Sequence, residues 1–312
     1  MNKTRIVVAG IGGVGGYFGG LLAKHFDKDD AVSVCFLARG EHLKAIKKDG
    51  LKVVKGADQF VAMPALATDD ASEIGIADFV IVTTKSYDLE QAVVQLKPCI
   101  DSKTVIVPFL NGVDSRERIK SVFPENMVLD GCAYIVSRLT EAGKVENLGN
   151  IEKLFFGLDH FENEQLRQLE SLFIQAGIEA KLSVNIATVI WEKFIFIAAI
   201  ATATTYFDCN IGAIVSDPEK VQAFTDLVNE VKQIALAKQI AIVQDITDRT
   251  LKILHAMPAE ATSSMHSDFL NKKAHNELQS LTGYVVREGE KYGLKTPVFN
   301  KMFGALEHKT QQ

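Results

Sequence analysis

The chain has 312 residues, more than one hydrophobic core usually organises, so we expect two domains. Hydrophobic residues make up 47% and charged residues 23%, the balance of an ordinary globular protein. The formal net charge of −5 argues against a general nucleic-acid-binding surface. The four cysteines form no C-x-x-C pair, and the cysteines and histidines show no metal-ligand spacing. We therefore expect no metal site and free thiols in a reducing compartment.

Two further features predict a cytoplasmic protein with no membrane partner. The N-terminus lacks the charged start and the cleavage site of a signal peptide. The longest strongly apolar run, Phe194–Ala203, is about half as long as a membrane span.

The chain begins with the pattern of a dinucleotide-binding unit. The apolar run Ile6–Ala9 is typical of a buried parallel strand, and a G-x-G-x-x-G motif starts directly after it at Gly10. These glycines allow a tight turn, close approach of a pyrophosphate and close packing of helix on strand. A helix over Val14–His25 and a strand over Val32–Ala38 follow. The alternative is a glycine-rich turn that only packs a helix on a sheet. The expected cofactor contacts are Gly10, Gly12, Gly13, Val14 and Gly15.

The end of the second strand helps to choose between NADH and NADPH. An NAD site usually has Asp or Glu there, to bind the ribose 2′-hydroxyl. Here the strand ends in Arg39-Gly40. A guanidinium binds a phosphate dianion through forked hydrogen bonds, so we expect NADPH with Arg39 on its 2′-phosphate. The alternative, to which the nearby Glu41 gives weight, is that Arg39 is a solvated loop charge.

Strand and helix alternate through the first half of the chain. Expected strands over Ala77–Val82 and Thr104–Leu110 flank a helix over Tyr87–Leu96, which predicts an α/β fold with a Rossmann-type, doubly wound parallel sheet. Lys85 and Asn111 follow the carboxyl ends of these strands, where such sheets bind ligands. Both are therefore candidates for cofactor and substrate binding. The alternatives are a solvated lysine and an Asn-Gly turn.

Near Ser183 the pattern changes, and almost only helical periodicity follows. We therefore expect a dinucleotide-binding domain over residues 1–183 and an all-α substrate and catalytic domain over residues 184–312. The cleft between two such domains is the usual place for a small-molecule substrate.

The expected second domain opens with a long buried helix over Asn185–Tyr206. A last long helix is expected from Glu277 to Gly293, with Pro297 beyond it as a helix stop. The buried apolar helix would also allow a homodimer.

Lys193 stands at the head of the apolar stretch of the long helix. A cation there is costly unless it is paired or useful. An ammonium can stabilise the negative charge that develops on a ketone oxygen during hydride transfer, and can donate the proton. Lys193 is therefore a candidate general acid. The alternatives are an ion pair with Glu192 or a side chain that extends to solvent.

Taken together, the motifs resemble those of the ketopantoate reductases, NADPH-dependent 2-dehydropantoate 2-reductases. The resemblance covers about residues 6–297. It implies a Rossmann domain, an all-α domain and an active site between them, with reduction of a branched 2-oxo acid to pantoate, a precursor of pantothenate and coenzyme A. The matching segments, in family order, are the glycine loop, Thr83-Thr84-Lys85, Asn111-Gly112, Trp191-x-Lys193, Thr262-Ser263-Ser264-Met265 and Asn276–Gly283.

The resemblance implies a role for each matching residue. Lys193 would be the general acid on the carbonyl oxygen, and Glu277 would bond the substrate's hydroxyl or carbonyl. Ser264 would bind the substrate's carboxylate. Asn111 would hold cofactor or substrate near the nicotinamide, and Lys85 would lie beside both.

This chain departs from the family beside Lys193. Many members have asparagines four and eight residues after the lysine, where this chain has Ile197 and Ala201, and another family asparagine is replaced by Ala261. Such a loss of polar lining favours a second hypothesis, a paralogous NADPH-dependent reductase of a less hydroxylated 2-oxo acid. A third hypothesis, a non-catalytic NADPH-binding sensor, would not need a general acid. Candidates to replace the asparagines are Thr202, Thr204, Thr205 and His266.

Overall fold

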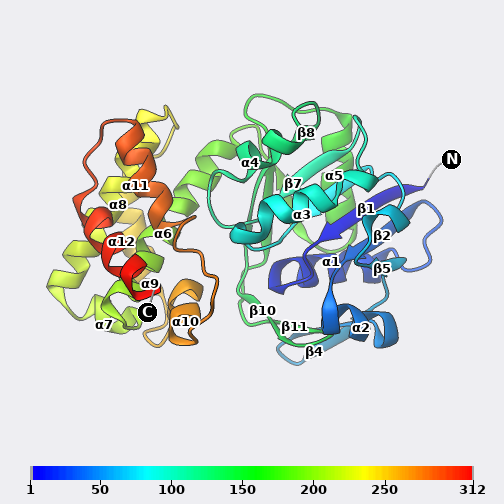
Figure 1. Ribbon diagram of the computed structural model, residues 1–312, viewed down its shortest axis with the longest axis horizontal. Helices are drawn as coiled ribbons and strands as arrows, with labels where there is room; N and C mark the ends of the chain where they lie inside the picture. The colour runs from blue at the N-terminus through cyan, green and yellow to red at the C-terminus, as the bar shows by residue number, and fades with distance from the viewer. Residues whose placement is uncertain (1–2, 311–312) are drawn as a thin grey trace. The chain divides into compact units, whose positions relative to one another are not determined.

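The computed structural model describes residues 3–310, which form two compact units (Figure 1). The first unit comprises the chain up to Leu110 together with Asp114–Ile186. The second comprises the short segment Asn111–Val113 and the chain from Ala187 onward. The domain boundary expected between residues 183 and 184 remains a proposal.

The first unit contains the strands and the shorter helices of the chain. Its elements are β1 (Thr4–Ala9), α1 (Gly13–His25), β2 (Val32–Leu37), α2 (Gly40–Asp49), β3 (Leu51–Lys55), β4 (Asp58–Ala62), β5 (Leu66–Thr68), β6 (Phe79–Val82), α3 (Leu89–Gln95), β7 (Val105–Pro108), α4 (Ser115–Val122), β8 (Met127–Val128), β9 (Asp130–Tyr134), β10 (Ser137–Glu141), β11 (Lys144–Asn147), β12 (Lys153–Gly157), α5 (Glu164–Gln175) and β13 (Glu179–Leu182).

The main sheet of this unit has six strands in the order β5-β2-β1-β6-β7-β8, and every neighbouring pair is parallel. This is the strand order of a Rossmann fold, so the predicted doubly wound sheet is confirmed. Two smaller sheets complete the unit, in the orders β10-β11-β3-β4 and β13-β12-β9.

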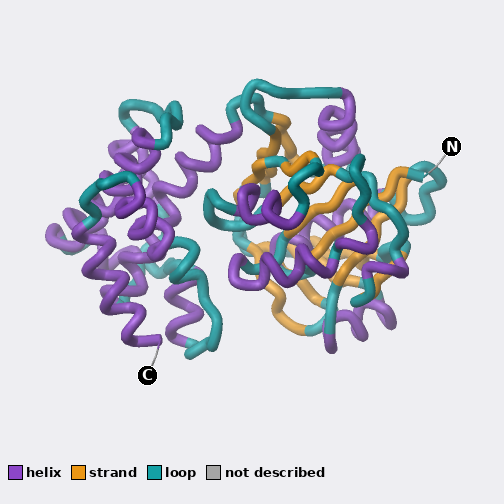
Figure 2. The backbone as a smooth tube through the Cα atoms, turned by 45° about the horizontal axis from the view of Figure 1, so that its top comes forward, coloured by secondary structure: helices purple, strands orange, loops and turns teal. Residues whose placement is uncertain are grey.

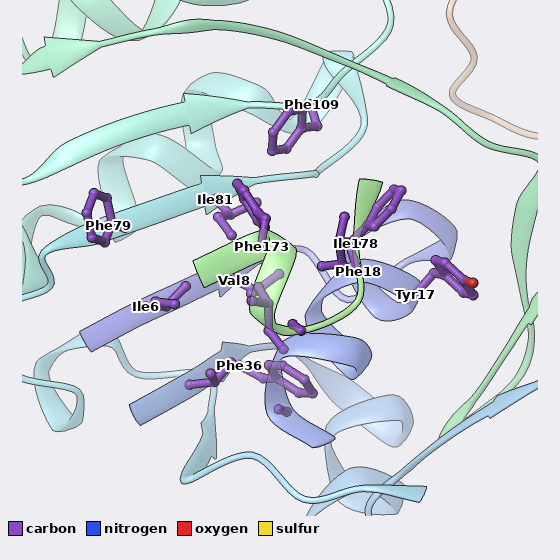
Figure 3. Packing of buried hydrophobic residues seen from close by; sticks show 14 of the residues in the cluster. Ile6, Val8, Tyr17, Phe18, Phe36, Phe79, Ile81, Phe109, Phe173 and Ile178 are labelled. Carbon is purple, nitrogen blue, oxygen red and sulfur yellow. The ribbon is translucent and has the colours of Figure 1, made fainter. Parts of the chain in front are cut away.

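The central strands are buried on both faces, as their continuous apolar runs predict. Ile6 and Val8 of β1 face one hydrophobic cluster, whereas Val7 faces another. Figure 3 shows side chains from β1, α1 and α5 gathered in the first of these clusters. Because both faces of β1 are covered, the glycine loop at its carboxyl end is held on a rigid support.

The second unit is built from helices, as Figure 2 shows, so the predicted all-α part of the fold is confirmed. Its helices are α6 (Ile186–Phe207), α7 (Ile211–Val215), α8 (Pro218–Ala237), α9 (Ile246–Ala256), α10 (Ser264–Leu270), α11 (Thr282–Lys291) and α12 (Pro297–Thr310).

The long helix α6 forms part of the core of this unit. Phe194, Ile195 and Ala198 are at most 2% exposed. By length and composition alone α6 could cross a membrane, but most of its apolar stretch is buried inside the protein. The core helix of a globular protein passes the same test, and the burial of α6 fits that role.

The expected end of the helical pattern is wrong in two respects. α11 begins at Thr282, so Glu277 lies in the turn before it. Pro297 does not stop a helix but begins α12, at a position where its missing N–H costs nothing. The carboxylate of Glu230 accepts hydrogen bonds from the N–H groups of Val298 (2.9 Å) and Phe299 (3.0 Å), which caps α12 from outside its own sequence.

Candidate functional site

The glycine loop between β1 and α1 is packed tightly against the end of β6. Gly10 has φ +93°, and a Cβ there would lie 2.8 Å from the Thr84 nitrogen. A Cβ on Gly15 would lie 2.2 Å from both the Gly10 carbonyl oxygen and Thr83 Oγ1. Thr83 Oγ1 also donates a hydrogen bond of 2.7 Å to the Gly10 carbonyl. The close contact of loop, strand and helix therefore requires these two glycines.

Gly12 has the opposite environment, because no atom lies within 4 Å of where its Cβ would be. It is the N-cap of α1, a helix of 13 residues, and its side of the helix N-terminus carries no side-chain cap. An open glycine at a helix N-terminus fits the pyrophosphate of a dinucleotide.

Two residues with hydroxyl groups to which the sequence analysis gave no role lie beside this loop. Thr84 Oγ1 and Ser137 Oγ are buried without a hydrogen-bond partner in the described structure. The backbone of Thr84 approaches Gly10, and the Ser137 carbonyl oxygen would lie 2.3 Å from a Cβ on Gly13. Thr84 belongs to the segment Thr83-Thr84-Lys85 quoted above, whereas Ser137 begins β10 and no local pattern links it to the loop.

Arg39 is the N-cap residue of α2, directly after β2. Its side chain is 76% exposed and forms an ion pair of 3.0 Å with Asp88. Asp88 ends a short 3-10 helix, Ser86–Asp88, and the exposed Lys85 lies just before that helix. An exposed ion pair of this kind contributes little free energy, so the guanidinium is available to a phosphate.

In the second unit, two of the predicted residues meet. Lys193 Nζ, on α6, donates a hydrogen bond of 3.4 Å to Asn111 Oδ1. Asn111 belongs to the short segment that follows Leu110, and Gly112 turns the chain with φ +108°. Both side chains are partly buried. A carboxamide that accepts from an ammonium restricts where the remaining N–H groups of that ammonium point, which suits a directed proton donor.

The face of α6 beyond Lys193 is apolar. Ile197, one turn along, is partly buried, and Ala201, two turns along, is 2% exposed. The hydroxyls of the neighbouring threonines are already engaged in hydrogen bonds within the unit. Their hydroxyls bond the Thr282 hydroxyl, the Ile200 carbonyl and the Ala201 carbonyl, from Thr202, Thr204 and Thr205 respectively.

Glu277 and Ser264 lie in separate segments of the second unit. Glu277 is only 2% exposed, in the turn before α11, and its backbone carbonyl accepts from Ser280 Oγ and the Leu281 nitrogen. Ser264 is the first residue of α10 and is exposed. A carboxylate as buried as that of Glu277 is costly to keep unless it has a partner or a function.

Family models match most of the chain. Residues 6–159 match the model described as "Ketopantoate reductase PanE/ApbA", and residues 185–310 match the model of its C-terminal part. The chain belongs to the ketopantoate reductase PanE/ApbA family. It is therefore a member of a family of oxidoreductases, and the resemblance given by its motifs is confirmed.

Related proteins match this chain over nearly its whole length. The crystal structure of 2-dehydropantoate 2-reductase from Porphyromonas gingivalis W83 is 34% identical, with a TM-score of 0.86, over 98% of this chain and 99% of that one. An uncharacterized oxidoreductase of Bacillus subtilis strain 168, YkpB, is 29% identical over 97% of this chain and 98% of its own. A 2-dehydropantoate 2-reductase of Streptococcus pyogenes serotype M3 is 26% identical over 97% and 96%.

Proposed function

We propose that this protein is an NADPH-dependent 2-dehydropantoate 2-reductase, which reduces ketopantoate to pantoate for pantothenate and coenzyme A synthesis. The observation that carries the proposal is the hydrogen bond between Lys193 Nζ and Asn111 Oδ1. It joins two residues that the family motifs single out independently. The 34% identity to the Porphyromonas gingivalis enzyme supports the same substrate.

The glycine loop and Arg39 would hold the cofactor. Gly12 offers open space at the N-terminus of α1 for the pyrophosphate, together with Gly10, Gly13, Val14 and Gly15. Arg39 would bind the 2′-phosphate, and the exposed Lys85 would lie beside cofactor and substrate. Bound NADPH supplies the hydride for the C2 ketone.

The protein's own residues would then handle the proton and the substrate. The Lys193 ammonium donates a proton to the carbonyl oxygen as that oxygen becomes an alcohol, and solvent reprotonates the lysine. Asn111 directs the ammonium by accepting its hydrogen bond. Glu277 bonds the substrate's hydroxyl or carbonyl, and Ser264 donates to its carboxylate. One hydride and one proton enter the substrate, so the reaction is balanced.

The test is steady-state oxidation of NADPH with ketopantoate by wild type and Lys193→Ala. We expect kcat to fall by about two to four orders of magnitude, because proton donation to the oxygen is lost. NADPH affinity, measured by fluorescence titration, should change little. Lys301→Ala, which removes an exposed lysine of α12, is the matched control and should keep full activity. Cofactor binding without turnover of any 2-oxo acid would instead favour a sensor.

The apolar face of α6 favours a second candidate, a reductase of another 2-oxo acid. Ile197 and Ala201 offer no hydrogen bond to the 4-hydroxyl of ketopantoate. The matched substrate is 3,3-dimethyl-2-oxobutanoate, which differs from ketopantoate by that hydroxyl alone. A kcat/KM higher for the deoxy compound would identify the second candidate, whereas a value about tenfold or more lower would support ketopantoate.

We also propose that the protein is cytoplasmic and forms a homodimer. Sedimentation velocity of the purified chain tests the dimer directly.

A further inference from the structure

The run Thr262-Ser263-Ser264 carries three hydroxyl groups with three different environments. Thr262 Oγ1 lies 2.6 Å from Nδ1 of His266. Ser263 Oγ lies 2.8 Å from Thr204 Oγ1. The exposed side chain of Ser264 forms no hydrogen bond with any residue in the range 3–310 that the structure describes. The sequence alone does not distinguish these three neighbours.

The first hydroxyl is held through His266, which is only 5% exposed. Nε2 of this imidazole lies 2.9 Å from Oδ1 of Asp208, the residue directly after α6. An ionised carboxylate only accepts hydrogen bonds, so Nε2 carries the proton. In the neutral ring Nδ1 is then the acceptor, and the Thr262 hydroxyl donates to it. With the ring neutral, the bonds run in one direction, from Thr262 through His266 to Asp208.

The second hydroxyl is held by α6 itself. Thr204 has a single hydroxyl proton and lies 2.7 Å from the Ile200 carbonyl, which can only accept, so Thr204 donates to it. Ser263 must then donate to Thr204. Ser263 Oγ also accepts from the His266 N–H at 3.0 Å, as the N-cap of α10. Both Thr262 and Ser263 are thus committed to internal bonds.

The chain just before the run is also attached to the residues after α6. The Ile211 nitrogen donates to the Ala261 carbonyl (2.9 Å), and the Gly212 nitrogen donates to the Ala259 carbonyl (2.8 Å). A Cβ on Gly212 would lie 2.8 Å from Cβ of Ala259, so the two backbones run in close contact. The segment that leads to Ser264 is therefore fixed along its length.

We propose that Asp208, His266 and Thr262 are positioning residues that hold the Ser264 hydroxyl ready for the substrate's carboxylate. The inference rests on the proposed function, which gives Ser264 that ligand. A group held in its bound position loses less conformational freedom on binding, so its affinity is higher. Because the carboxylate is bound in both the ground state and the transition state, the effect falls on KM and not on kcat.

Asp208 offers a matched pair of variants. Its φ is +51°, a backbone conformation that Gly and Asn tolerate well. Asp208→Gly removes the acceptor of His266 without backbone strain, whereas Asp208→Asn keeps a side-chain oxygen that accepts from Nε2. Since 66% of the Asp208 side chain is exposed, neither variant should prevent folding.

Thr262 offers a second pair. Thr262→Val keeps the shape and loses the hydroxyl, and Thr262→Ser keeps the hydroxyl. The control is Thr225→Val in α8, which loses a hydroxyl bonded to the Val221 carbonyl of its own helix and should leave the kinetics unchanged.

We expect Asp208→Gly and Thr262→Val each to raise KM for the 2-oxo acid about five- to thirtyfold, the loss of one hydrogen bond, with kcat within about twofold of wild type. Asp208→Asn and Thr262→Ser should restore most of the KM. KM for NADPH should not move. The double variant Asp208→Gly/Thr262→Val should be no worse than the poorer single variant, because both cut the same set of bonds.

The outcomes separate this inference from the proposed function. If wild type turns over the 2-oxo acid and Ser264→Ala raises its KM, yet Asp208→Gly and Thr262→Val leave KM unchanged, the positioning role is overturned and the function stands. Failure of Asp208→Asn to restore KM also contradicts the role. A wild type that turns over no 2-oxo acid overturns the proposed function and this inference together.

Discussion

In the proposed function the preference for NADPH depends on Arg39, whose only ion-pair partner among the described residues is Asp88. We expect Arg39→Ala to raise KM for NADPH by about ten- to a hundredfold, the loss of charge-assisted hydrogen bonds to the 2′-phosphate. The freed Asp88 carboxylate would add repulsion. KM for NADH should change by less than about threefold, because that cofactor lacks the phosphate.

Arg167→Ala is the control for this measurement, since Arg167 is 64% exposed and also has a single carboxylate partner, Glu162. Equal increases in KM for NADPH and NADH would show that Arg39 supports the site without binding the 2′-phosphate.

Asp130 gives the stability of the protein a defined pH dependence. Burial raises the pKa of its carboxyl to about 6, although Arg116 at 3.9 Å opposes the shift. A folded-state pKa above the unfolded value means that the native state binds the proton more tightly, so stability increases as the pH falls through 6 toward 4.

We therefore expect Asp130→Asn to stabilise the protein by about 1–3 kcal/mol at about pH 8, where the wild-type carboxylate is ionised and desolvated. The gain should vanish near about pH 4.5, where the wild-type group is protonated. Thermal denaturation at both pH values measures it, with Asp69→Asn as an exposed control. A gain that is the same at both pH values would rule out titration of Asp130 as its cause.

At the scale of elements, the junction of β1 and α1 contains glycines that the packing requires and one, Gly12, that we propose serves the cofactor instead. A Cβ on Gly15 would collide with backbone and with Thr83, whereas a Cβ on Gly12 meets nothing. We expect Gly12→Ala to leave the unfolding temperature within about 2 °C of wild type and to weaken NADPH binding about tenfold or more. Gly15→Ala should lower the unfolding temperature itself. Thermal denaturation and cofactor titration of the two variants test this division. Equal destabilisation by Gly12→Ala and Gly15→Ala would contradict it.

The elements that local pattern predicted correctly are those whose signals lie close together. β1, the glycine loop, α1 and β2 occupy fewer than forty consecutive residues, and each is marked by its own apolar run or glycine. The start of α12 was missed because its cap, Glu230, comes from α8. The parallel pairing of β11 with β3 was also beyond local pattern, since Val145 lies opposite Val53.

The candidate site, like the fold, could be predicted from the sequence only where local pattern sufficed. Residue type and position in the chain singled out Lys193 and Asn111, but not that they meet, because 82 positions separate them. Likewise the sequence marked Thr262 and Ser264 as one motif, and only the structure shows that Thr262 is bonded to His266 and, through it, to Asp208.

At the scale of the whole molecule, each of the two units buries many hydrophobic side chains, and we expect more than one unfolding transition. Trp191 is the single tryptophan, 3% exposed in the second unit, so its fluorescence reports that unit alone. We expect urea unfolding followed by Trp191 fluorescence and by circular dichroism to give different midpoints. NADP⁺ at about a hundred times its Kd should stabilise the first unit by about 2.7 kcal/mol and move the dichroism curve more. Superimposable curves in both conditions would mean that the units unfold as one.

The segment Asn111–Val113 has a consequence for the order in which the protein matures on the ribosome. These three residues follow β7 in the chain, but they belong to the second unit. Domains generally fold from the N-terminus as synthesis proceeds, so the Rossmann sheet can form while α6 is still untranslated. Asn111 can form its hydrogen bond with Lys193 only after that lysine is added, 82 residues later. If the glycine loop binds the cofactor and Lys193 donates the proton, as proposed, a truncated translation product that ends before α6 would capture nucleotide without being able to use it.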